Sequence, residues 1–395
     1  MLFNKPIILT FCGYYLPGYK GGGPIRTIES MVELLGDEFI YKIITRDRDL
    51  GSTERYDAIQ VNEWQKVGKA EVFYVSPDKL NLFFLRKIIS ETPHDILYLN
   101  SFFSPKFTIL PMMLRRLGLI PKRNTIIAPR GEFSPGAINI KRFKKKIFIL
   151  ITHIIGLYSD VTWHVSSFHE QNDLFYFFKD SQHEKTKTKS IIASDLTDIV
   201  PKGMTKSSLK EAGRLKVVFI SRISPKKNLD GALKLIADLK GKVLFDIYGP
   251  LEDKVYWDQC CKLIEKLPSN IKVSYKGFLN HDEVLDVFAE HDLFFFPTLG
   301  ENFGHVIIEA LAAGCPVLIS DRTPWRNLEK ENVGWDIPIE KPEYFNKILQ
   351  KCLNMGNEEM EHLSNCSFNY AKNKMIDKQN LHRNRSLFLK NYCGK

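Results

Sequence analysis

The chain has 395 residues, of which 44% are hydrophobic and 26% are charged, so it is long enough to form two domains with separate cores. Its net charge of +10 is compatible with a nucleic-acid binder, but we find no recognition helix or RNP-like aromatic motif and expect no nucleic-acid partner. The seven cysteines show neither metal-binding nor disulfide spacing. The N-terminus does not predict a signal peptide, and the apolar stretch 147–158 does not predict a membrane span. We therefore expect a cytoplasmic protein that is either soluble or peripheral on the inner face of the cytoplasmic membrane.

Short apolar runs that alternate with helical patterns predict an α/β protein with two similar halves. In the first half we expect strands at 6–11, 39–45, 95–99 and 124–128, followed by apolar helical stretches to about residue 180. In the second half we expect strands at 216–220, 243–248, 271–275, 292–297 and 316–320. We therefore place one domain at 1–200 and a second at 201–375, with a hinge within 181–214 and a basic C-terminal helix at 376–395.

A glycine-rich loop follows the first expected strand. Gly21, Gly22 and Gly23 precede a helix whose apolar residues recur at helical spacing. Because glycine has no Cβ, a loop of this kind lets the backbone approach a ligand closely. Ordinary surface turns are glycine-rich as well, so the motif takes its meaning from the rest of the chain.

The stretch TRDRDLG at 45–51 places Asp47 and Asp49 in a D-x-D pattern after an expected strand. Such a pair of carboxylates can hold a divalent metal. Here Arg46 and Arg48 would compete with a cation for both carboxylates, so we expect a local ion-paired loop and no metal site.

Polar residues follow two further strands of the first half. The strand within 126–129 ends before Arg130 and Glu132, and Asn100 ends the preceding one. The carboxyl ends of parallel strands lie at one edge of a sheet, where ligands bind. We expect these three residues to contact a sugar or an acceptor, or Arg130 and Glu132 to pair with each other.

Basic and apolar residues adjoin each other in the first half. In KRFKKKIFIL (141–150) five of the first six residues are basic and the next four are apolar, and MMLRRLGLIPKR (112–123) has a similar mixture. Such a composition is typical of surfaces that dock on anionic membranes. A solvated helix face, or lysines that bind an acceptor phosphate, explains it equally well.

Two stretches of the second half carry the most specific pattern. In FISRISPKKNLDGAL (219–233), Arg222 and Lys227 follow a strand. In PTLGENFGHVIIEALAAGCPVLIS (297–320), Glu301 lies in a loop and Glu309 lies in the helix that follows it. The amides at the start of that helix form an anion site, and Glu309 stands roughly 7 Å further along the helix, about the offset between a diphosphate and its ribose.

Together these stretches resemble the E-x7-E signature, and the strand-ending Arg and loop Lys, of the retaining GT-B glycosyltransferases, family 4 (glycosyl transferases group 1). The resemblance implies two Rossmann-like, doubly wound α/β domains that face a cleft, with a C-terminal helix that crosses back to the first domain. It also implies that the first domain binds the acceptor and the second binds the nucleotide-sugar.

The resemblance assigns roles to individual residues. It implies that Glu301 lies near the donor sugar, that Glu309 binds the ribose, and that Arg222 and Lys227 hold the diphosphate. Together with the expected anion site at the helix start and the position of Phe278 after a strand, it gives the further donor contacts Gly22, Gly23, Phe278, Asn302, Phe303, Gly304 and His305.

The acceptor side departs from the family pattern. Arg130 stands where many relatives carry a His that contacts the donor sugar, and Asn100 likewise replaces a His. We therefore count Arg130 with Glu301, Arg222 and Lys227 as a candidate catalytic residue, but the general base stays open.

The expected activity is retaining transfer of a hexosyl or N-acetylhexosaminyl group from a nucleotide-sugar to a glycan or polyprenyl-linked acceptor, in bacterial surface polysaccharide synthesis. No cofactor is expected, because the nucleotide-sugar is a substrate. A nucleotide-sugar epimerase shares this architecture, but it needs acid and base residues on the carbons of the sugar itself. A basic nucleic-acid binder is the alternative from another class.

Overall fold

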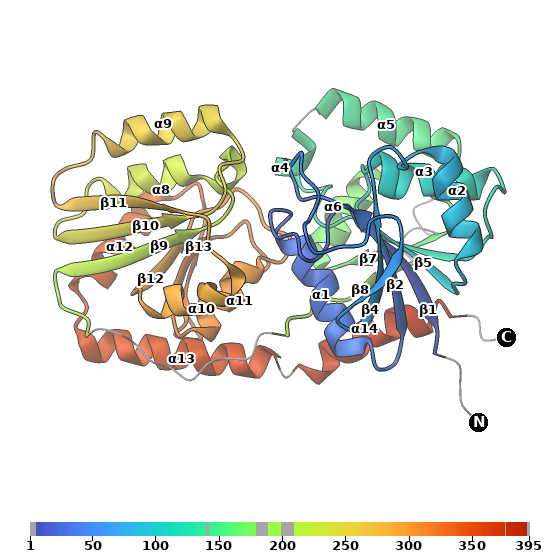
Figure 1. Ribbon diagram of the computed structural model, residues 1–395. Helices are drawn as coiled ribbons and strands as arrows, with labels where there is room; N and C mark the ends of the chain where they lie inside the picture. The colour runs from blue at the N-terminus through green and yellow to red at the C-terminus, as the bar shows by residue number, and fades with distance from the viewer. Residues whose placement is uncertain (1–4, 140–141, 179–188, 199–208, 376, 393–395) are drawn as a thin grey trace. The chain divides into compact units, whose positions relative to one another are not determined.

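The computed structural model describes residues 5–139, 142–178, 189–198, 209–375 and 377–392, and the chain divides into two compact units (Figure 1). The first unit comprises Met1–Asp198 together with Lys378–Lys395, and the second comprises Ile199–Asp377. Much of the expected hinge, at 181–188 and 199–208, lies outside the described residues.

The first unit is built on an eight-stranded sheet with the order β3-β4-β2-β1-β5-β6-β7-β8. Its neighbouring strands are parallel, except that β3 runs antiparallel to β4. The strands are β1 Ile7–Phe11, β2 Ile40–Arg46, β3 Trp64–Val67, β4 Ala70–Val75, β5 Ile96–Asn100, β6 Asn124–Ala128, β7 Val161–Val165 and β8 Ser190–Ile192.

Helices cover both faces of this sheet, and each face has its own apolar core. One face packs against α1 Gly23–Leu35 and α14 Lys378–Leu389. The other packs against α2 Leu82–Glu91, α3 Leu110–Arg116, α5 Arg142–Ile154 and α6 Phe168–Phe177. Two short helices, η1 Pro105–Ile109 and α4 Pro135–Asn139, lie in the connections.

Two sequence expectations for the first unit were wrong in detail. Residues 161–165 form β7, although we expected helical stretches up to residue 180. The segment VTWHV is rich in β-branched and aromatic residues, and pairing with β6 decides its conformation. The hairpin of β3 and β4 was missed as well.

The second unit contains a six-stranded sheet with the order β11-β10-β9-β12-β13-β14, and its described strands are all parallel. The strands are β9 Arg214–Ile220, β10 Lys242–Tyr248, β11 Ile271–Gly277, β12 Leu293–Phe296, β13 Val317–Ser320 and β14 Gly334–Ile337. All five expected strands are present, whereas β14 was not anticipated.

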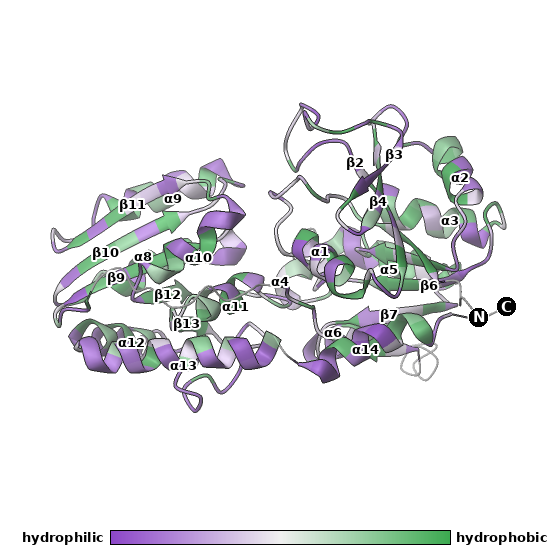
Figure 2. Ribbon diagram, turned by 60° about the horizontal axis from the view of Figure 1, so that its bottom comes forward, coloured by the Kyte–Doolittle hydropathy of each residue, from purple (hydrophilic) through white to green (hydrophobic). Residues whose placement is uncertain are grey.

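Helices also cover both faces of the second sheet (Figure 1). One group is α8 Leu229–Ile236, α9 Lys254–Ile264 and α12 Pro342–Asn354. The other is α10 His281–Ala289, α11 His305–Ala312 and α13 Asn357–Met375, and a single turn, η2 Pro225–Lys227, precedes α8. Figure 2 shows hydrophobic residues along the central strands and mostly hydrophilic residues along α13. Within the described ranges, no helix combines the length and the apolar character needed to cross a bilayer.

The C-terminal helix belongs to the first unit, although it follows the second unit in the chain. The ring of Phe388 on α14 lies 5.4 Å from that of Phe39, 6.0 Å from that of Tyr41 and 5.5 Å from that of Tyr98. Asn384 donates to the carbonyl oxygen of Ser194 at 2.9 Å. The expected return of the last helix to the first domain is therefore confirmed.

Phe388→Ala should destabilise the first unit by about 3–5 kcal/mol, because it empties a fully buried aromatic site. Chemical denaturation followed by circular dichroism measures the change. Leu389→Ala alters the adjacent side chain, which is 48% exposed, and should shift the free energy of unfolding by no more than about 0.5 kcal/mol. Equal losses in the two variants would show that α14 is not anchored through Phe388.

Candidate active site

The two loops that carry the family-like residues of the second unit are joined by hydrogen bonds. They follow β9 and β12, which are neighbours in the sheet. The amide of Leu299 donates to the carbonyl oxygen of Lys226 at 2.9 Å, and Asn228 Nδ2 donates to the carbonyl oxygen of Pro297 at 2.8 Å. The loops therefore form one framework at the carboxyl edge of the sheet.

Lys227 and Glu301 meet across this framework in an ion pair. Their side chains are only 12% and 14% exposed, so the pair is largely shielded from water. The Lys227 ammonium also lies 5.6 Å from the ring centroid of Phe296, which ends β12. The structure thus brings together two residues that lie in separate motifs of the sequence.

Arg222 is held at the rim of the same edge. Its guanidinium forms an ion pair with Glu252 at 3.0 Å, and the two side chains are 34% and 40% exposed. The loop before Arg222 depends on Gly249, because a Cβ on that glycine would lie 1.8 Å from the carbonyl oxygen of Ser221. Any side chain at 249 would push the strand ends apart.

The start of α11 is built from backbone and aromatic contacts. Gly304 precedes the helix with φ 80°, in the left-handed region that glycine adopts readily, and it brings no side chain to cap the first turn. The Glu301 side chain lies against Gly304, because a Cβ added to Gly304 would lie 3.6 Å from Glu301 Cγ. A carboxylate and a helix N-terminus therefore adjoin each other.

Aromatic rings support this helix start. His305 is buried, and its ring centroid lies 4.8 Å from that of Phe303. Trp325 Nε1 donates to the carbonyl oxygen of Phe303 at 2.6 Å. Sequence reasoning missed Trp325, which lies outside both motif stretches, and gave no role to Asn228, although that residue lies within 219–233. Their only sequence signal is that each belongs to a loop after a strand.

The remaining predicted donor residues lie at several places in the second unit. Glu309 is nearly buried within α11, and Asn302 is partly exposed in the loop before it. Phe278 follows the last residue of β11 and is 41% exposed. These positions are compatible with a ligand that lies along the carboxyl edge of the sheet.

The glycine loop of the first unit is fixed by a carboxylate. Asp49 accepts hydrogen bonds from the amides of Tyr19 and Lys20 at 2.9 and 3.1 Å. Gly22 precedes α1 with φ 68°, and Gly23 is the first residue of the helix. Asp49 is therefore a positioning residue for the loop that contains both predicted glycines.

The D-x-D stretch is an ion-paired loop, but only in part as expected. Asp47 pairs with Arg48 at 2.8 Å, whereas Asp49 serves the glycine loop. Arg46 pairs with neither carboxylate. Among the residues that the structure describes, no cluster of three or more His, Cys, Asp or Glu side chains is placed to hold a metal ion.

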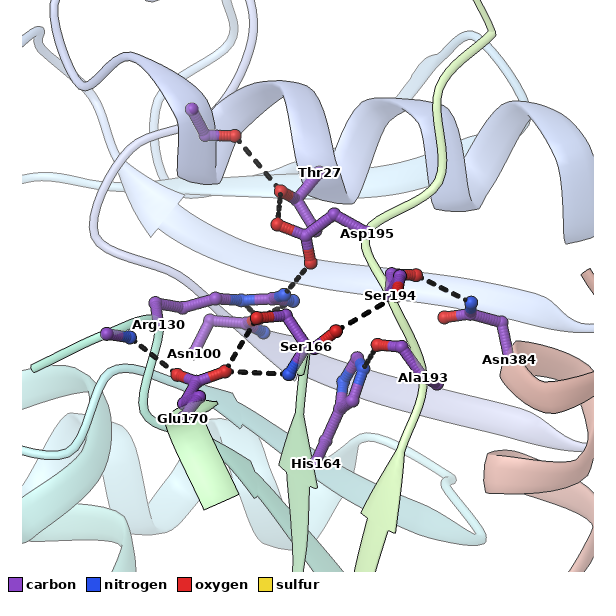
Figure 3. A network of polar contacts seen from close by, with 12 residues as sticks. Thr27, Asn100, Arg130, His164, Ser166, Glu170, Ala193, Ser194, Asp195 and Asn384 are labelled. Carbon is purple, nitrogen blue, oxygen red and sulfur yellow. Dashed lines mark hydrogen bonds and ion pairs between the residues drawn. The ribbon is translucent and has the colours of Figure 1, made fainter. Parts of the chain in front are cut away.

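Arg130 lies in a buried polar network of the first unit (Figure 3). It forms an ion pair with Asp195 at 2.6 Å and donates to Asn100 Oδ1 at 2.8 Å and to the Tyr98 hydroxyl at 2.7 Å. Asp195 also accepts from the hydroxyl of Thr27 on α1 at 2.9 Å. The Arg130 side chain is only 7% exposed, so a structural role explains it better than contact with a sugar.

Glu132 does not pair with Arg130, which settles an alternative that the sequence left open. It accepts from the Ser101 hydroxyl at 2.7 Å and from the amides of Phe102 and Phe103 at 2.5 and 3.0 Å. Burial raises the pKa of Glu132, and these three donors oppose that effect. Glu132 therefore shapes the loop after β5.

His164 completes the network as a neutral ring. Arg130 donates to the Tyr98 hydroxyl, so Tyr98 donates to His164 Nδ1 at 2.8 Å, and Nε2 donates to the carbonyl oxygen of Ala193 at 2.9 Å. Burial, assisted by the nearby Arg130 charge, lowers the pKa of His164 to about 4. The network thus holds residues 193–195 against the sheet at neutral pH.

Comparisons with known proteins find a similar family domain and similar folds. Residues 204–369, most of the second unit, match the family model described as "Glycosyl transferases group 1". The chain is similar to HepE from Anabaena in complex with UDP and glucose, with a TM-score of 0.68, 14% identity, and 98% and 99% of the two chains covered. For sucrose-phosphate synthase from Thermosynechococcus elongatus the TM-score is 0.71, with 13% identity and the same coverage.

Two curated relatives are similar in sequence. An uncharacterized 41.2 kDa protein in the cps region of Klebsiella pneumoniae is 26% identical over 60% of this chain and 62% of its own length. O-antigen chain mannosyltransferase B of Escherichia coli is 26% identical over 27% of this chain and 28% of its own. Each match thus spans less than two thirds of the relative.

The fold is that of the GT-B glycosyltransferases. Through its second unit, the chain carries a glycosyl transferases group 1 domain.

Proposed function

We propose that this chain is a retaining glycosyltransferase that moves a sugar from a nucleotide-sugar to a glycan or lipid-linked glycan in bacterial surface polysaccharide synthesis. The observation that carries the proposal is the meeting of Lys227 and Glu301 at the start of α11, inside the domain that matches the family. The names of similar proteins support the donor and the pathway. HepE was crystallised with UDP and glucose, WaaG takes part in lipopolysaccharide biosynthesis, and a third protein builds O-antigen chains.

The ion pair suggests how the donor is received. Lys227 is neutralised by Glu301 in this structure, so a diphosphate competes with Glu301 for the ammonium group. Arg222 and the N-terminus of α11 supply further positive potential for the phosphates. Once Lys227 turns to the phosphate, the Glu301 carboxylate is released to accept from the hydroxyls of the donor sugar. Glu309 and Phe278 are proposed to bind the ribose and to border the base.

The transfer step needs no metal in this proposal. The bond from the anomeric carbon to the diphosphate oxygen breaks, and the bond to the acceptor oxygen forms on the same face of the sugar. The leaving diphosphate gains negative charge, which Lys227 and Arg222 stabilise, and it takes up the proton of the acceptor hydroxyl. The anomeric configuration is therefore retained.

A panel of nucleotide-sugars, incubated with the protein in EDTA, tests the activity. We expect one donor to be hydrolysed slowly to nucleoside diphosphate and free sugar, and to be used faster once a glycan acceptor is present. NMR of the product should show an α-linkage from an α-linked donor. An inverted linkage would refute retention, activity restored only by Mn²⁺ would refute the metal-free step, and conversion of the donor to its epimer would favour the epimerase.

Variants of the ion pair separate the two proposed roles. Lys227→Met should weaken binding of the nucleoside diphosphate by about 10- to 100-fold, because a charge-assisted contact is lost. Glu301→Gln should bind the nucleoside diphosphate at least as tightly as the wild type, because Lys227 is released, yet lose about 30-fold in kcat/KM. Calorimetry and initial rates measure both effects. Glu331→Ala, on the exposed surface of the same unit, is the control.

If Glu301→Gln instead weakens binding of the nucleoside diphosphate as strongly as Lys227→Met does, the pair acts as one structural unit. The proposed replacement of Glu301 by the diphosphate at Lys227 is then wrong. If both variants keep wild-type kinetics, the site lies elsewhere.

A further part of the proposal concerns the membrane. The exposed face of α5 carries large apolar side chains at helical spacing, and Phe143 and Ile154 are each 76% exposed. The others on this face are Ile147, Leu150 and Ile151. The exposed basic residues Arg142, Lys144 and Lys146 lie in the first turns of the same helix. We propose that α5 docks on an anionic bilayer, because its charges complement lipid headgroups and its apolar face inserts beside them.

The adjoining helix extends this surface. Arg116 at the end of α3 donates to the carbonyl oxygen of Ile155 at 3.3 Å, which places the ends of α3 and α5 together. Leu117, which follows α3, is 67% exposed. Lys145 is not part of the basic surface, because its ammonium lies 4.8 Å from the ring centroid of Phe103 and donates to the carbonyl oxygen of Ala137.

Sedimentation with vesicles tests this docking. The wild type should bind anionic but not neutral vesicles, and binding should weaken with salt. Replacing Lys144 and Lys146 with Glu, or Leu150 and Ile154 with Ser, should reduce binding at least about tenfold while donor hydrolysis is unchanged. Val255→Ser removes an equally exposed apolar side chain from α9 and should bind as the wild type does. A wild type that stays in the supernatant at low salt would indicate a soluble acceptor.

A further inference from the structure

Arg46 lies where parallel sheets bind ligands. It is the last residue of β2, at the carboxyl edge of the first sheet. In that sheet β1 lies between β2 and β5, and the strand order continues to β4 on one side and to β6 and β7 on the other. The order thus reverses at β1. Ligands bind outside the carboxyl ends of the strands at such a switch point.

Two aromatic rings from either side of this switch point hold the Arg46 guanidinium. Its central carbon lies 5.7 Å from the ring centroid of Tyr14, which follows β1, and 5.2 Å from that of Phe107, which follows β5 in η1. The buried Nε makes no hydrogen bond, and the residue as a whole is partly exposed to solvent. The rings position the group, and the residue reaches the surface.

The charge of Arg46 is not balanced by the protein around it. Within the described part of the chain, no carboxylate oxygen lies within ion-pair distance of its guanidinium. The nearest acidic residues in sequence are engaged elsewhere, since Asp47 pairs with Arg48 and Asp49 accepts amides of the glycine loop. By contrast, Arg130 on the same edge of the sheet has a counter-ion, since Asp195 lies 2.6 Å from its guanidinium. A half-buried guanidinium without a counter-ion is costly unless an anion joins it.

We propose that Arg46 binds an anionic group of the acceptor substrate, either a phosphate or a carboxylate. The planar guanidinium offers two parallel N–H donors to such a group, and Tyr14 and Phe107 fix its orientation. A polyprenyl phosphate and an acidic sugar present the same oxyanion chemistry. This inference rests on the proposed glycosyl transfer, because it assigns the acceptor to the first unit. It predicts that neutral glycans are poor acceptors.

Calorimetry with small probes tests the site, with UDP present so that the second unit offers no other phosphate site. The probes are pentyl phosphate, methyl glucuronoside and the neutral methyl glucoside. At least one anionic probe should bind the wild type more tightly than the neutral probe, and the preferred anion distinguishes a phosphate from a carboxylate. Arg46→Gln should weaken binding of that probe by about 10- to 100-fold. Arg46→Lys should weaken it by less, because an ammonium group keeps the charge but loses the bidentate geometry.

Arg86→Gln is the matched control, because it removes the same charge from an exposed position on α2. It should bind all probes as the wild type does. Circular dichroism should show that Arg46→Gln is folded, and its UDP affinity and donor hydrolysis should be unchanged. The inference is overturned if no anionic probe binds more tightly than the neutral probe, or if Arg46→Gln binds the probes as tightly as the wild type does. It is also overturned if Arg46→Gln binds UDP more weakly, because that result would assign Arg46 to the donor. Wild-type protein that hydrolyses no nucleotide-sugar would refute the proposed function instead, whatever the probes show.

Discussion

Parallel strand order is the constraint on which both units depend. In a parallel sheet every loop that follows a strand emerges at the same edge, so residues far apart in sequence become neighbours. In the second unit this brings Lys227, after β9, into contact with Glu301, after β12. In the first unit it brings Arg46, after β2, against rings that follow β1 and β5. Each candidate site is thus a consequence of sheet topology before it is a matter of individual side chains.

The buried cations of this protein differ in the number of partners that surround them. The guanidinium of Arg130 has hydrogen-bond partners in Asp195, Asn100 and Tyr98. Through Tyr98 and His164 the network extends to the carbonyl oxygen of Ala193. Lys227 is satisfied by a single partner, Glu301. A fully satisfied cation gains little from a ligand, because its hydrogen bonds would only be exchanged. This difference is why we assign a structural role to Arg130 and propose substrate binding for Lys227.

The sequence predicted the second unit more completely than the first. The run from β12 through α11 to β13 was anticipated nearly to the residue, because a buried strand, a glycine loop and a helix follow one another with clear boundaries. In contrast, β7 was mistaken for helix, since VTWHV becomes a strand only by pairing with β6. The partner of Arg130 could not be foreseen, because Asp195 lies 65 residues away in a segment without a motif. Local patterns identify elements, whereas partners depend on the tertiary fold.

The origin of α14 has a consequence for synthesis. The first unit needs Leu387 and Phe388 to complete one of its two cores, yet these residues are translated after the whole second unit. At roughly 5–20 residues per second, the ribosome takes on the order of ten seconds or more to make the intervening segment. During that interval the first unit exposes the apolar surface around Phe39 and Tyr41 that α14 later covers. The second unit has no such requirement, so the nascent chain finishes its folding in the reverse order of its domains.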